Sequence, residues 1–237
     1  MFKNRSAEAE IMDDLDFSDP VIFQTLKEID TINAWLGGNN VTMSAIKKLL
    51  KEYKSDSALS IADLGCGSGE MLRKISHWAN KKGLKVQLVG IDANPHIVEY
   101  ARKSSVGYSD ISYHAINIFS SEFEQKKYDI ITCTLFCHHF DDESLSKILS
   151  SLSKSVSIAI VINDIHRHWF AYYSIKWLTS FFSKSYMVKY DSRLSVLKAF
   201  KRVELENILK KAEIKNYIIK WKWAFRYQLV INRLQER

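Results

Sequence analysis

Three glycines at alternate positions, Gly65, Gly67 and Gly69, are the residues whose spacing points most directly to ligand chemistry. They follow an apolar run that contains Asp63, and apolar residues at helical spacing come after them. Glycine adopts positive φ readily and lets the backbone approach a ligand that a Cβ would exclude. The expected order of strand, glycine turn and helix predicts a turn that binds a nucleoside-containing cofactor.

Glu70 discriminates between two cofactor classes that such a turn could bind. The dinucleotide fingerprint needs a small third residue at this position, and a carboxylate there would oppose a pyrophosphate at the helix N-terminus. The run from Asp63 to Gly69 instead resembles motif I of the class I S-adenosylmethionine-dependent methyltransferases. That resemblance implies a cofactor site formed by Asp63, Gly65, Cys66, Gly67 and Gly69, with Asp63 serving the ammonium of S-adenosyl-L-methionine.

Three further apolar segments end in residues that could complete this site. The segment 85–92 ends in Asp92, whose carboxylate could accept both ribose hydroxyls and also cap the next helix. The resemblance implies three more contacts along the chain. Ala93 would lie beside the adenine, Asn117 and Ile118 would bind its amino edge after a strand at 111–116, and Thr134 would face the methionine after a strand at 128–134.

Histidines follow the expected fourth and fifth strands. Methyl transfer is an in-line displacement, so the protein must position the acceptor and, for a hydroxyl acceptor, remove its proton. Histidine suits that task because it titrates near neutral pH. We predict His166 or His168 as the base, with Asp164 orienting an imidazole. His139 is a further candidate, and His138 and His139 are equally compatible with structural support.

The four histidines and Asp164 are also an alternative set of metal ligands. In the family that the chain resembles, metal-dependent catechol-type enzymes use acidic ligands at the end of strand four. The residues at 134–137, Thr-Leu-Phe-Cys, offer none. We therefore predict that the protein uses no metal.

An aromatic insert at about 167–198 separates the fifth expected strand, 157–162, from the last long helix. We expect it to cap the acceptor site, which favours a hydrophobic acceptor. It could equally be ordinary core, or an interfacial helix in peripheral contact with a membrane. The aromatic residues expected to form the cap are Tyr172, Tyr173, Trp177, Phe181, Phe182 and Tyr186.

The segment 163–168 and the insert after it resemble bacterial methyltransferases associated with type III polyketide synthases. This implies O-methylation of a phenolic or polyketide-like small molecule in secondary metabolism. Nucleic acid is not the expected acceptor, because the chain lacks the Asn/Asp-Pro-Pro-aromatic run of amino-directed nucleic-acid enzymes. The alternatives are C-methylation of a quinone-type ring and a non-catalytic cofactor-binding protein that docks a membrane or protein partner. A homo-oligomer is compatible with either.

Alternating strand and helix patterns predict an α/β fold. We expect a Rossmann-like, doubly wound sheet, mostly parallel with an antiparallel terminal strand, and the family resemblance implies seven strands. The catalytic core would span residues 56–237, with final strands around 214–219 and 225–231. Residues 1–55 would form an N-terminal helical extension that acts as a lid.

The composition bounds the setting in which the protein works. The chain has 237 residues, a formal net charge of +7 and three cysteines without a C-x-x-C pair, as expected of free thiols in a reducing compartment. The start of the chain has no apolar h-region and no apolar run is long enough to span a bilayer, so we expect a cytoplasmic protein. Basic residues dominate from Arg167 onward, and we interpret them as a solvated face.

Overall fold

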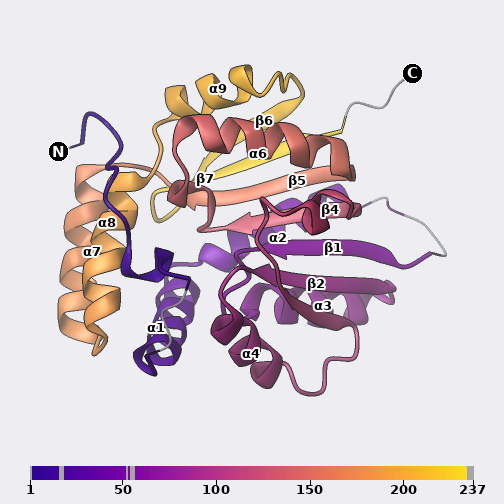
Figure 1. Ribbon diagram of the computed structural model, residues 1–237, viewed down its shortest axis with the longest axis horizontal. Helices are drawn as coiled ribbons and strands as arrows, with labels where there is room; N and C mark the ends of the chain where they lie inside the picture. The colour runs from indigo at the N-terminus through magenta and orange to yellow at the C-terminus, as the bar shows by residue number, and fades with distance from the viewer. Residues whose placement is uncertain (1, 16–18, 52, 54–56, 234–237) are drawn as a thin grey trace.

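In a computed structural model that describes residues 2–15, 19–51, 53 and 57–233, seven strands form one sheet in the order β3-β2-β1-β4-β5-β7-β6 (Figure 1). The strands are β1 Leu59–Leu64, β2 Val86–Asp92, β3 Ile111–Ala115, β4 Tyr128–Thr134, β5 Val156–Ile165, β6 Tyr217–Lys222 and β7 Arg226–Asn232. Strands β1 to β5 pair in parallel, whereas β7 runs antiparallel to both β5 and β6. The predicted fold class is confirmed.

The register of the parallel strands brings distant parts of the sequence to one edge of the sheet. Leu64 lies beside both Ile91 and Cys133, and Cys133 lies beside Ile162. The segments that follow β1, β2, β4 and β5 therefore leave the sheet at the same carboxyl edge, where open α/β sheets bind their ligands.

The helices cover both faces of the sheet because each buries one apolar stripe. Buried side chains of α2, α3 and α4 pack on one face, and those of α6 and α9 pack on the other. The helix bounds are α1 Val21–Trp35, α2 Gly38–Leu49, α3 Glu70–Lys82, α4 Pro95–Ser104, α5 Ser121–Glu124, α6 Asp142–Ser155, α7 Trp169–Phe182, α8 Tyr186–Lys198 and α9 Arg202–Lys211, with 3₁₀ turns η1 Ile11–Asp13 and η2 Cys137–His139.

The N-terminal segment and the predicted insert come together beside the sheet. The insert forms two adjacent helices, α7 and α8, with α1 next to them (Figure 1). Residues before α1 run along α8, where the Asp191 carboxylate accepts the backbone N–H groups of Ile11 and Met12 at 2.9 and 3.1 Å. The predicted domain boundary between residues 55 and 56 lies outside the described residues.

Several element boundaries differ from the predictions. Strand β5 extends to Ile165, because β7 continues its pairing as far as Arg226 opposite Ile165. Asn163 and Asp164 are therefore strand residues and not loop residues. Only Leu36 and Gly37 separate α1 from α2, because Gly37 adopts a left-handed φ of 70° and α2 begins at Gly38. No helix in the described part of the chain is both long and apolar enough to cross a membrane.

Candidate active site

A cavity of about 400 Å³ opens at the carboxyl edge of the sheet. Its walls come from the ends of β1, β2, β3 and β4 and from the N-terminal segment, which contributes Met12, Asp13 and Leu15. Of the predicted cofactor residues, it brings together Gly65, Gly67, Asp92, Ala93, Asn117 and Ile118.

The glycine turn has the backbone geometry that the motif predicts. Gly65 and Gly67 have φ of 65° and 52°, in the left-handed region that glycine alone adopts without strain. A Cβ on Gly65 would lie 2.3 Å from a ring carbon of Phe136, so a larger residue there would displace a wall of the cavity.

Asp92 is the acidic group that β2 contributes to this cavity. Its Oδ2 accepts the N–H of Gly67 at 3.3 Å and its Oδ1 accepts the N–H of Asn94 at 3.1 Å. Burial raises the pKa of Asp92, although the backbone N–H groups oppose that shift. The carboxylate is thereby fixed at the cavity wall, where oxygens suited to ribose hydroxyls are needed.

Four of the predicted cofactor residues do not line the cavity. Asp63 is 3% exposed and accepts the hydroxyl of Thr132 at 2.6 Å, and burial raises its pKa to about 7. Cys66 is buried, Gly69 is the N-cap of α3, and Thr134 shares a hydrogen bond with Thr42. Asp63 is therefore buried against β4 through Thr132, and its predicted contact with the ammonium stays a prediction.

A second, apolar cavity of about 340 Å³ lies between α1, α7, α8 and the turn that joins β6 to β7. Leu135 lines both cavities. It has a φ of 54°, and a non-glycine residue in that region costs free energy that the surrounding structure must offset. The strained residue thus lies where a cofactor and an acceptor would meet.

The aromatic residues predicted to cap the acceptor site do not line the apolar cavity. The insert does wall the apolar cavity, but it does so with Phe170 and with aliphatic and small residues such as Ala171, Ile175, Leu178 and Val188. The six aromatic residues expected in this role do not line it, and Trp177, Phe181 and Phe182 are 66%, 75% and 67% exposed. Helix α7 places its aromatic residues on the outer side, because its inner side packs against the cavity and α8.

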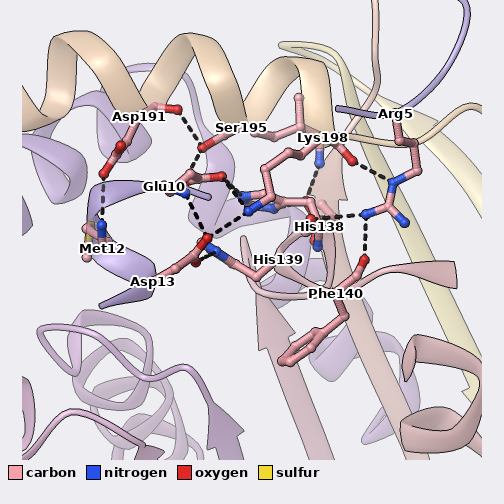
Figure 2. A network of polar contacts seen from close by, with 12 residues as sticks. Arg5, Glu10, Met12, Asp13, His138, His139, Phe140, Asp191, Ser195 and Lys198 are labelled. Atoms are coloured by element: carbon pink, nitrogen blue, oxygen red, sulfur yellow. Dashed lines mark hydrogen bonds and ion pairs between the residues drawn. The ribbon is translucent and has the colours of Figure 1, made fainter. Parts of the chain in front are cut away.

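His138 is the centre of a buried polar network beside the cofactor cavity (Figure 2). Its Nδ1 lies 2.7 Å from Oδ1 of Asp164, and its Nε2 lies 3.6 Å from Oε1 of Glu10. Asp164 also accepts the backbone N–H of His138 at 3.1 Å. Because both side chains are buried, this histidine is fixed in one orientation by Asp164.

His139 is the histidine that reaches the cofactor cavity. Its Nδ1 lies 2.5 Å from Oδ1 of Asp13, whose other oxygen accepts the ammonium of Lys198 at 2.8 Å (Figure 2). Burial alone would raise the pKa of Asp13, but the hydrogen bonds and charges of His139 and Lys198 hold it below its usual range. Burial raises the pKa of Glu10 to about 7, against the charges of His139 and Lys198.

Glu10, His138 and His139 could hold a metal ion, since each places one ligand atom within 4.8 Å of the other two. Carboxylates behind both imidazoles, as found here, are typical of metal-binding histidines. The Lys198 ammonium already lies 3.6 Å from Glu10 and supplies positive charge to the same cluster. The set differs from the alternative based on four histidines, because it excludes His166 and His168. The absence of a metal stays a prediction.

The structure places His166 and His168 together, with ring centroids 5.6 Å apart, but neither lines the two cavities. His168 stacks on Phe225, with centroids 5.0 Å apart, and its Nδ1 accepts the N–H of Phe170 as the N-cap of α7. His166 accepts the indole N–H of Trp221 at 3.3 Å. Burial lowers the pKa of His166, and His168 adds to that shift.

Four residues that line or adjoin the two cavities were not predicted from the sequence: Glu10, Asp13, Asn33 and Arg226. Glu10 and Asp13 belong to an acidic N-terminal stretch whose partners lie more than 120 residues away, at His138 and His139. A usable signal existed for Arg226, which is a cation inside the apolar run 225–231. Asn33 carries no such signal.

The chain combines an open, mostly parallel sheet with a glycine turn and an acid at the next strand end, a combination with which α/β folds bind nucleoside cofactors. Residues 61–157 match the family model described as a methyltransferase domain. The protein-lysine N-methyltransferase EFM4 of Saccharomyces cerevisiae is 31% identical over 108 residues, which cover 43% of this chain and 45% of that protein. The malonyl-[acyl-carrier protein] O-methyltransferase of Acetivibrio thermocellus is 27% identical over 111 residues, covering 46% and 37% respectively.

Among solved structures, the plantazolicin methyltransferase BpumL in complex with SAH matches this fold with a TM-score of 0.65 at 21% identity, over 92% of each chain. The chain spans less than half the length of the curated relatives that it matches. The chain therefore contains a methyltransferase domain at residues 61–157, and it has the fold of the solved BpumL structure.

Proposed function

We propose that the protein is an O-methyltransferase that transfers a methyl group from S-adenosylmethionine to a hydrophobic, phenolic or polyketide-like small molecule. The observation that carries this proposal is the apolar cavity of about 340 Å³, which shares Leu135 with the cavity of the glycine turn. Apolar pockets with few polar groups are typical of sites for small hydrophobic ligands.

The residues of the larger cavity fit the cofactor of this family. Gly67 and Asp92 would hold the ribose, and Asn117 and Ile118 would lie beside the adenine. When bound, S-adenosylmethionine supplies a methyl group on a positively charged sulfur. The protein then has to hold the acceptor in line with that methyl group, exclude water and remove the hydroxyl proton.

We propose His139 as the base, in preference to His166 and His168. It lines the cofactor cavity, whereas the other two lie beyond Phe225. An Nδ1–H donated to Asp13 leaves Nε2 free to take a proton, and Asp13 stabilises the resulting charge. Asp164 acts on His138 and is a positioning residue in this scheme.

Methyl transfer from labelled S-adenosylmethionine to a panel of phenols and hydroxylated polyketide-like compounds tests the proposal. His139→Ala should lower kcat by about 10²- to 10⁴-fold and leave cofactor affinity within a few-fold. His96→Ala, on the exposed surface of α4, is the control. Full activity in His139→Ala with a loss in His166→Ala or His168→Ala would reverse the assignment. A product methylated on carbon would favour C-methylation of a quinone-type ring.

Peripheral membrane contact and homo-oligomer formation stay predictions. The feature that supports a surface contact is the exposed aromatic side of α7. A membrane contact through this side of α7 would bring a lipophilic acceptor near the apolar cavity.

A further inference from the structure

Arg226 is a buried cation without a carboxylate in ion-pair contact in the described part of the chain, although the charge of Asp164 acts on it from a longer distance. The residue is 5% exposed and lies at the start of β7. The guanidinium donates to Oδ1 of Asn33 at 2.7 Å and to Oδ1 of Asn163 at 3.4 Å. Both partners are neutral amides, and the Nε of Arg226 has no hydrogen-bond partner among the described residues.

Arg167, the other buried arginine among the described residues, is neutralised, which sets Arg226 apart. Arg167 forms an ion pair with Glu204, and Arg5 pairs with Asp142 at 2.7 Å. Burying a charge is costly unless it is paired, and arginine is rarely buried otherwise. Burial lowers the pKa of Arg226 to about 10, so the guanidinium still carries its charge at neutral pH.

The unpaired guanidinium lines the apolar cavity, together with Asn33 and Ser192. The Ser192 hydroxyl is also a buried polar group without a hydrogen-bond partner among the described residues. Arg226 and Ser192 both line this cavity, whose other walls are mostly apolar, and each has a buried donor without a partner, Nε and Oγ respectively. A buried donor left without an acceptor costs free energy, and a ligand that supplies an acceptor recovers it.

The backbone is shaped to admit this guanidinium. A Cβ on Gly38 would lie 2.8 Å from Nη2 of Arg226 and 2.1 Å from Oδ1 of Asn33. Only glycine at the start of α2 leaves room for both groups. Asn33, on α1, then holds the guanidinium in place by accepting a hydrogen bond from its Nη2.

We propose that the apolar cavity binds an acceptor with a carboxylate group, and that Arg226 and Ser192 recognise that carboxylate. A planar guanidinium matches a carboxylate in geometry and charge. The apolar walls would hold the hydrophobic body of the same molecule. This inference rests on the proposed function for the identity of the ligand as methyl acceptor, but the anion site itself is independent of catalysis.

Calorimetric binding of 2-naphthoate and of its neutral counterpart 2-naphthamide, in the presence of S-adenosylhomocysteine, tests the proposal. Wild-type protein should bind naphthoate about ten- to hundredfold more tightly, the effect of one charge-assisted contact. Arg226→Gln should abolish that preference. Asn33→Asp should do the same with an almost isosteric change, because it places a carboxylate beside the guanidinium. Arg202→Gln, an exposed arginine on α9 paired with Glu206, should leave the preference unchanged.

Failure of wild-type protein to prefer naphthoate, or a preference that survives in both cavity variants, would overturn the proposal. Labelled methyl transfer in the same preparations separates it from the proposed function. Selective naphthoate binding without methyl transfer to any acceptor would leave the anion site standing and remove the proposed function. Methylation of neutral phenols by a protein indifferent to naphthoate would do the opposite.

Discussion

Single residues govern the cofactor cavity through their position at strand ends. Asp92 lines the cavity and has both oxygens fixed by backbone N–H groups, as the proposed contact with ribose requires. Local sequence revealed it because an apolar run that ends in an acid needs no information from elsewhere. Asp63 also ends an apolar run in the sequence, yet it is buried, accepts the hydroxyl of Thr132 and does not line the cavity.

Replacing Asp92 with asparagine should weaken S-adenosylhomocysteine binding by about ten- to hundredfold, because an amide cannot accept hydrogen bonds from two hydroxyls as a carboxylate does. Calorimetry measures the affinity. Asp129→Asn is the matched control, because Asp129 also accepts a backbone N–H, from Ser60 at 2.8 Å, but lies at the opposite edge of the sheet. Unchanged affinity in Asp92→Asn would contradict the assignment.

Among the elements, the N-terminal segment has the greatest influence on the site. Arg5 joins it to the core by donating to the backbone oxygens of His138, Phe140 and Lys198 (Figure 2). Its guanidinium lies 4.4 Å from the centre of the Phe200 ring. Met12, Asp13 and Leu15 of the same segment line the cofactor cavity. The segment therefore closes the site only if its polar contacts with η2 and α8 are intact.

Arg5→Ala should loosen this segment without unfolding the sheet. Hydrogen bonds from a charged donor contribute about 1.5–3 kcal/mol each and are not additive, so we expect local protection to fall by about 2–4 kcal/mol. Hydrogen exchange of residues 2–15 measures the change. Lys147→Ala removes an exposed pair with Glu143 on α6 and should have little effect. Equal protection in Arg5→Ala and wild-type protein would show that Arg5 does not hold the segment.

The molecule as a whole buries several acids, and this makes its stability depend on pH. Glu10 and Asp63 have pKa values of about 7 in the folded protein because burial disfavours their charged forms. The folded state therefore binds more protons than the unfolded state between about pH 4 and pH 7. Their contribution to stability is complete below the unfolded pKa and is lost as the pH rises through 7. Asp13 and Asp164, whose pKa values are lowered by histidines and Lys198, act in the opposite sense in acid.

We expect the free energy of unfolding to fall between pH 5 and pH 8, with Glu10 contributing up to about 3 kcal/mol of the change. Denaturant titrations at several pH values measure it. Glu10→Gln should be flatter over this range than wild-type protein, because glutamine does not titrate. Glu122→Gln, whose side chain is exposed, should keep the wild-type slope. A Glu10→Gln variant as sensitive to pH as wild-type protein would refute the role of Glu10.

The sequence determined the α/β fold, the strand–turn–helix around Gly65 and Gly67, and the strand-end position of Asp92, because periodicity and turn chemistry are local. It also indicated an insert beside the acceptor, but it could not say which side of α7 faces inward. Basic residues of the C-terminal half such as Arg202, Lys210 and Lys211 are exposed as predicted. Arg167, Lys198 and Arg226 are exceptions, because they are buried.

Only the tertiary structure decided which charges are paired and which are not. Glu10 meets His138, and Asn33 meets Arg226, across separations of 128 and 193 residues along the chain. Such contacts follow from how helices and strands pack, and no local pattern encodes them. The two cavities that share Leu135 also depend on tertiary packing, because their walls are assembled from segments far apart in the sequence.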